Sequence, residues 1–156
     1  MASVEQLWLG ARFGGAAAVL ATAGLALIVA ALVSRAPPDF ADRPVVAVLR
    51  DTRQHPGWAI RLAQTAHQIA VDALDPPAPP AGKSYQLWLD APAAGPPRPL
   101  GLLPRSGRKI MAETPTNTRL LAGKGELEVT LEPATGTLAE TPSGSPVFRS
   151  GLPGSG

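Results

Sequence analysis

The stretch GKSYQLWLD, residues 82–90, decides the fold of the chain. Its side chains alternate between two faces of an extended strand, and Tyr85, Leu87 and Leu89 share the face expected to join a core. The opposite face carries Trp88, which a loop or a second layer of structure must cover. The proline-rich runs DPPAPPA and APAAGPPRPLGLLP flank the stretch and mark loops. The stretch therefore predicts one well-formed strand held between two loops.

Other segments of the chain repeat this pattern. ELEVTLEP, residues 126–133, has the clearest alternation, with Leu127, Val129 and Leu131 inward and its polar side chains outward. Further strands are expected at VVAVLRD (45–51), at WAIRL (58–62) and HQIAVDAL (67–74), which form a hairpin, and at PLGLLP (99–104), a proline-bounded edge strand. TNTRLLAGKG (116–125) has room for one helical turn before a glycine. Short strands with frequent turns predict a mainly β fold, an antiparallel β-sandwich.

Composition supports short strands and excludes some functions. The 156 residues include 18 Pro and 16 Gly, which interrupt long elements and favour turns. The formal net charge is only +2 and aromatic residues make up 4%, so we expect no nucleic-acid partner. Cysteine is absent, which excludes disulfides and thiolate metal sites.

An uncharged apolar run, GGAAAVLATAGLALIVAALV, occupies residues 14–33. As a helix rising about 1.5 Å per residue, it covers roughly the 30 Å of a bilayer's hydrocarbon core. Arg12 and Arg35 flank it. We predict a single transmembrane helix; the alternatives are a cleaved signal peptide, with Ser34 to Ala36 as its cleavage site, and a buried soluble helix. Charge alone does not settle its orientation.

These patterns predict the organisation of the chain. We expect a short cytoplasmic or juxtamembrane segment (1–13), the transmembrane helix (14–34), a linker (35–44), an extracytoplasmic β-sandwich domain (45–152) and a tail (153–156).

The sequence offers no catalytic or metal-binding constellation. His55 and His67 are the only histidines, and their spacing fits no metal motif. Glu126, Glu128 and Glu132 are interpreted as a solvated sheet face. GKG at residues 123–125 is a turn and not a phosphate loop, and PSGSP at residues 142–146 is not a GxSxG elbow. We therefore predict no enzyme, no catalytic, cofactor-binding or metal-binding residues, and no cofactor.

Several motifs occur in an order that resembles the extracytoplasmic carboxyl-terminal domain of the anti-sigma-K factor family, the RskA-like anti-sigma factors. The family has a P-x-G-K-x-Y-x-L-W strand, an S/P-L-G-x-L segment, an L-E-P-x-[GT]-G turn and a P-T/S-G-P-V-x-x-x-G tail. The matching positions are Pro80, Gly82, Lys83, Tyr85, Leu87 and Trp88; residues 99–103; residues 131–136; and Pro142, Gly144, Pro146, Val147 and Gly151, with Ser145 as an extra residue.

The resemblance implies a single-pass regulator in the inner (plasma) membrane, with its amino end in the cytoplasm and its carboxyl-terminal domain outside. Such a protein holds back an extracytoplasmic-function sigma factor until envelope and intramembrane proteases release it. The partners implied are that sigma factor, the proteases and the lipid bilayer. Residues 1–13 resemble only a juxtamembrane stretch, so we expect the sigma-binding domain upstream or on another protein, unless the chain keeps only the sensing half. The alternative is a membrane-anchored β-sandwich interaction module with no sigma-factor role.

Overall fold

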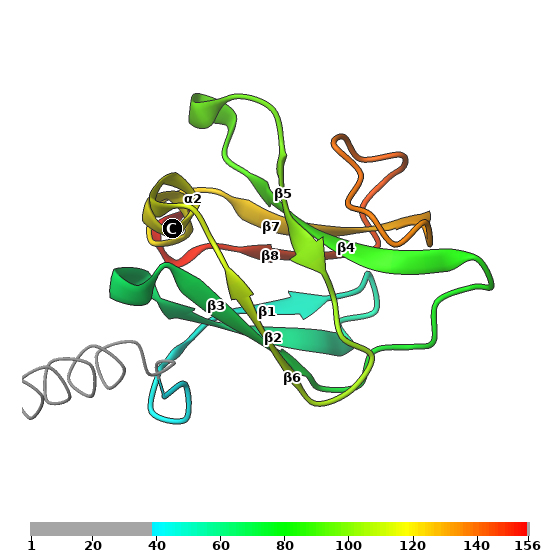
Figure 1. Ribbon diagram of the computed structural model, residues 1–156, viewed down its shortest axis with the longest axis horizontal. Helices are drawn as coiled ribbons and strands as arrows, with labels where there is room; N and C mark the ends of the chain where they lie inside the picture. The colour runs from blue at the N-terminus through cyan, green and yellow to red at the C-terminus, as the bar shows by residue number, and fades with distance from the viewer. Residues whose placement is uncertain (1–38, 156) are drawn as a thin grey trace, which may run out of the picture. The chain divides into compact units, whose positions relative to one another are not determined.

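The computed structural model describes residues 39–155, which form an eight-stranded antiparallel sheet (Figure 1). The strands are β1 (Val45–Arg50), β2 (Pro56–Ala63), β3 (Gln68–Ala73), β4 (Lys83–Asp90), β5 (Arg98–Leu102), β6 (Arg108–Ala112), β7 (Glu126–Pro133) and β8 (Phe148–Gly151). Helix α2 (Pro115–Leu121) lies between β6 and β7, and short 3₁₀ turns occupy Gln64–Ala66, Pro92–Ala94 and Pro153–Ser155.

The order of the strands divides the sheet into two halves. It runs β5-β4-β7-β8-β1-β2-β3-β6, so β8 and β1 join one four-stranded half to the other. The two ends of the sheet approach each other: Lys109 Nζ of β6 donates to the Leu102 carbonyl of β5 at 2.7 Å, and Met111 packs where Gly101 lacks a side chain. The sheet is thus nearly closed into a barrel.

The mainly β, antiparallel character expected from the sequence is confirmed. The layering differs from a sandwich of two separate sheets, because β1 and β8 make the halves continuous. Two short strands were not expected from the sequence. In both β6 and β8 only one residue is buried, Met111 and Phe148 respectively, so neither strand shows the alternation that marks the others.

The core inside the sheet is centred on three aromatic rings. Trp58 of β2, Tyr85 of β4 and Phe148 of β8 pack edge to face, with centroid separations of 5.1 Å from Trp58 to each of the other rings and 5.9 Å between those two. The buried Trp58 indole also donates to the Pro104 carbonyl at 2.8 Å. Because the three strands come from both halves, this cluster holds the halves together.

The stretch GKSYQLWLD contains β4, which pairs with β7 over eight register positions. Leu87 and Leu89 point into the core together with Val129 and Leu127 of β7. Leu131 is partly buried against the same cluster, so the inward positions expected for β7 are confirmed. β5 lies at one end of the strand order, as expected of an edge strand.

The outer face of β4 and β7 is also covered, here by the loop of residues 134–147. Gln86 holds this loop through two hydrogen bonds: its Nε2 donates to the Ala139 carbonyl at 2.8 Å, and its Oε1 accepts from the Ala139 N–H at 2.9 Å. Trp88 is fully buried and its Nε1 donates to Thr130 Oγ1 at 2.8 Å. The cover that Trp88 requires is therefore present.

One of the glutamates expected on a solvated face is buried in this layer. Glu132 is 2% exposed, and its Oε1 accepts hydrogen bonds from the Ser143 N–H at 3.0 Å and from the Thr130 hydroxyl. Burial alone would raise its pKa, but these hydrogen bonds and the charge of Lys83 hold the pKa of Glu132 below its ordinary value. The solvated interpretation of Glu132 is wrong because the PSGSP loop folds over it.

The segment that leads into β1 packs on the outer face of β2 and β3. Phe40 is 2% exposed and clusters with Ala63 and Ala70. The Arg61 guanidinium of β2 donates to the Arg43 carbonyl, and this second contact also holds the segment on the sheet. Of the linker expected at residues 35–44, the described part, residues 39–44, is therefore attached to the sheet through Phe40 and the Arg43 carbonyl.

The predicted transmembrane helix, residues 14–34, lies outside the described residues. Within residues 39–155, no helix has the length and apolar character that crossing a membrane requires.

Val129→Asp should abolish the cooperative unfolding transition of the domain. Val129 is fully buried, and an unpaired carboxylate in the core costs several kcal/mol, comparable with the roughly 5–15 kcal/mol net stability of a domain. Thermal melting followed by circular dichroism measures this. The neighbouring, partly exposed Glu128→Gln serves as the control, and a variant Val129→Asp that melts like the parent would contradict the inward assignment.

Glu132→Gln should lower the stability of the domain at pH 7 by about 1–2 kcal/mol, because charge-assisted hydrogen bonds become neutral ones. Since the folded-state pKa of Glu132 is lowered, its contribution is present above the ordinary carboxyl pKa and disappears as the pH falls. Urea denaturation at pH 7 and at low pH measures both effects. The exposed Glu140→Gln on the same loop should change neither, and equal stability of the two variants at pH 7 would refute the role of Glu132.

Candidate functional site

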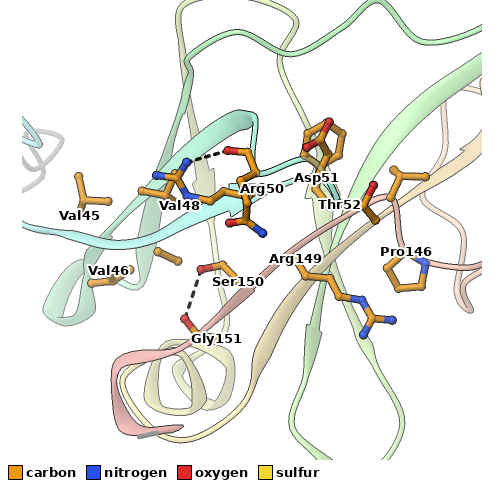
Figure 2. Close-up of a pocket in the computed structure, with 14 residues that line it drawn as sticks. Val45, Val46, Val48, Arg50, Asp51, Thr52, Pro146, Arg149, Ser150 and Gly151 are labelled. Atoms are coloured by element: carbon orange, nitrogen blue, oxygen red, sulfur yellow. Dashed lines mark hydrogen bonds between the residues drawn. The ribbon is translucent and has the colours of Figure 1, made fainter.

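A groove lies where the two halves of the sheet meet (Figure 2). A single register pair, Arg50 with Arg149, joins β1 to β8, whereas β7 and β8 share four such pairs. The groove follows this seam and has a volume of about 660 Å³. That volume is within the roughly 300–1,000 Å³ typical of ligand-binding clefts.

The backbones of both strands line the groove. Its walls are formed by consecutive residues, 45–48 on one side and 146–151 on the other. Since successive side chains of a strand point to opposite faces, a pocket on one face of a sheet would be lined by alternate residues. Consecutive lining therefore places the groove between the strands, in the plane of the sheet.

The side chains of the groove combine apolar surface with positive charge. Val45 is 42% exposed, and Val46 and Val48 are partly exposed beside it. Arg50 and Arg149 are exposed and lie directly opposite each other in the ladder, an arrangement of like charges that weakens strand pairing.

Neighbouring residues neutralise the charges of Arg50 and Arg149 only in part. The Arg50 guanidinium donates to the neutral Gln54 carbonyl at 2.9 Å, and no carboxylate of the described residues forms an ion pair with it. The Arg149 guanidinium forms an ion pair with Glu128, with Nη2 3.5 Å from Glu128 Oε1. Asp51 Oδ1 is engaged within its own turn, where it accepts from the Arg53 and His55 N–H groups.

The residues singled out from the sequence lie apart from this groove or take local roles. His55 is exposed in the turn after β1, with Nδ1 3.8 Å from Asp51 Oδ2. His67 precedes β3, and its Nδ1 lies 3.1 Å from Thr118 Oγ1. The structure does not bring the two histidines to one site, and residues 39–155 hold no cluster of three or more His, Asp or Glu suited to a metal ion.

The remaining candidates have structural explanations. Glu126 and Glu128 are partly exposed at the β7 outer face, and burial raises the pKa of Glu128 although the charge of Arg149 opposes this. The GKG segment is a turn, as expected: the Gly123 N–H donates to the Leu120 carbonyl at 2.9 Å after α2. A Cβ at Gly125 would meet the Asp90 carbonyl at 2.7 Å, so this position favours glycine.

A polar cluster beside α2 escaped the sequence analysis. Asn117 Nδ2 donates to Glu113 Oε2 at 3.0 Å, while Glu113 Oε1 and Gln68 Oε1 are buried without a hydrogen-bond partner. Burial raises the pKa of Glu113 to about 6, although the Asn117 hydrogen bond opposes the shift. A single glutamate after a short strand carries no pattern from which this could be predicted.

Glu113→Gln should stabilise the domain above pH 6. The folded-state pKa lies above the ordinary value of 4.5, so the folded domain binds the proton more tightly, and the parent loses stability as the pH rises from about 4.5 through about 6. Glutamine stays neutral and accepts from Asn117. Melting temperatures between pH 4 and 8 measure the difference in stability between Glu113→Gln and the parent, which should grow across this interval. The exposed Asp42→Asn serves as the control and should show no such difference. A difference that does not depend on pH would contradict the assignment.

Comparison with known proteins identifies the family of the chain. Residues 13–146 match the family model described as "Anti-sigma-K factor rskA, C-terminal". No curated protein and no solved structure shows a significant match. The family is regulatory and not enzymatic. Because the match spans most of the 156 residues, the chain belongs to the family of anti-sigma-K factor rskA carboxyl-terminal domains.

Proposed function

We propose that the chain is a membrane-bound anti-sigma factor, or its sensor half, that negatively regulates an extracytoplasmic-function sigma factor. The observation that carries this proposal is the family match, which begins at residue 13 and so takes in the apolar segment 14–34 together with strands β1 to β7. An anti-sigma factor acts by binding a sigma factor, so the partner follows from the family in general terms. The extracytoplasmic type is the finer part of the proposal.

The proposed location is the inner (plasma) membrane. Residues 14–34 cross it once, residues 1–13 lie in the cytoplasm, and the β domain lies on the extracytoplasmic side. Twenty uncharged residues match the hydrocarbon thickness of a bilayer, which supports the crossing. The domain then responds to envelope conditions, and proteolysis outside and then within the membrane releases the sigma factor.

A second candidate is a membrane-anchored interaction module with no role in transcription. The groove along β1 and β8 favours it, since a cleft of ligand-binding size is what such a module needs. The two candidates differ in what loss of the chain does to the cell.

Deleting the coding sequence should raise transcription from promoters of one extracytoplasmic-function sigma factor, because its inhibitor is lost. RNA sequencing measures this. Deleting the sigma-factor gene as well should abolish the increase, and restoring the chain should reverse it. Val129→Asp is the matched variant, since it disrupts the β domain (residues 39–155) and leaves residues 1–34 unchanged.

Unchanged promoters together with an altered envelope would refute the sigma-factor role and favour the interaction module. A tag placed after Gly156 tests the location independently. Protease added to spheroplasts should remove it, whereas a protected tag would contradict the extracytoplasmic placement.

A further inference from the structure

The β1–β8 seam is a place in the described sheet where two strand edges face each other with little backbone pairing. The outer ends of the sheet shield each other, because Met111 packs at Gly101 and Lys109 donates to the Leu102 carbonyl. At the seam, β1 and β8 share the single pair Arg50–Arg149. Backbone hydrogen-bonding capacity is thus available at this groove.

Unpaired strand edges require a particular kind of ligand. Alternate residues of a strand direct their N–H and C=O groups toward each neighbour, so both walls of the groove offer backbone donors and acceptors. At the Gly151 end, the carbonyl is met by the Ser150 hydroxyl at 3.3 Å, a weak local bond (Figure 2). Another extended backbone satisfies such edges better than an isolated side chain or a compact small molecule.

The side chains specify the ligand further. The exposed Val45, with Val46 and Val48, offers apolar contact to alternate side chains of an added strand. Arg50 has a neutral carbonyl as its hydrogen-bond acceptor, and Arg149 lies at the outer range of an ion pair with Glu128. A carboxylate between these two cations would relieve their cross-strand repulsion.

We propose that the groove between β1 and β8 binds an extended acidic peptide by strand addition, with its backbone along the seam, apolar side chains against the valines and a carboxylate at Arg50 and Arg149. This inference concerns the β domain alone. It holds whether or not the chain regulates a sigma factor, so its test and the genetic test above fail independently.

The experiment uses the purified full chain in detergent micelles. The probe is a short fluorescent peptide in which valine and threonine alternate and whose carboxyl end carries two glutamates. Fluorescence anisotropy should show saturable binding, and a matched peptide with two lysines should bind on the order of tenfold more weakly. Absence of saturable binding, or equal binding of the two peptides, would overturn the proposal.

Matched variants test the site. Arg50→Gln should weaken binding of the acidic peptide on the order of tenfold, because the lost contact is charge-assisted. The exposed Arg105→Gln, outside the groove, should leave binding unchanged. Circular dichroism checks that both variants keep the parent fold, which is expected because neither arginine forms an ion pair among residues 39–155.

Hydrogen exchange locates the ligand without mutation. The acidic peptide should slow amide exchange in residues 45–48 and 147–151 while leaving β5 and β6 unchanged. Protection confined to β5 or β6 would overturn the proposal. Concentration-dependent self-association that protects the groove in the free chain would also overturn it, since a second copy would then be the occupant.

Discussion

The edge-to-face packing of Trp58, Tyr85 and Phe148 is the interaction on which the rest of the structure depends. Backbone pairing alone barely joins the halves, because β1 and β8 share one register pair. The rings supply the missing cohesion from inside, and hold β8 in place although this strand has only four residues. A groove can therefore exist between β1 and β8 without separating the halves.

The loop that covers the outer face of β4 and β7 is held by side-chain hydrogen bonds. Gln86 and Glu132 point away from the core. The backbone of the covering loop pairs with both amide atoms of Gln86, and with Oε1 of Glu132. These bonds join motifs that lie far apart in the sequence: the strand with Gln86, the strand ending at Pro133 and the PSGSP segment form one hydrogen-bonded assembly. The motifs through which the chain resembles the family are thus partly architectural.

Much of this fold could be predicted from alternation alone. β4 and β7 carry large apolar side chains at every second position, and their inward residues were identified correctly. β8 could not be predicted, because it depends on Phe148 reaching a distant ring and not on a local pattern. The groove escaped prediction for the same reason: pairing between the first and the last strand leaves no local trace in sequence.

The seating of Phe40 on Ala63 and Ala70 has a mechanical consequence. Tension applied to the chain from its amino-terminal side reaches the sheet first at this aromatic contact and at the Arg61 bond to the Arg43 carbonyl. Both contacts are short-ranged and break within a few ångströms of extension. These two contacts ahead of β1 therefore break under tension before the strands of the sheet separate.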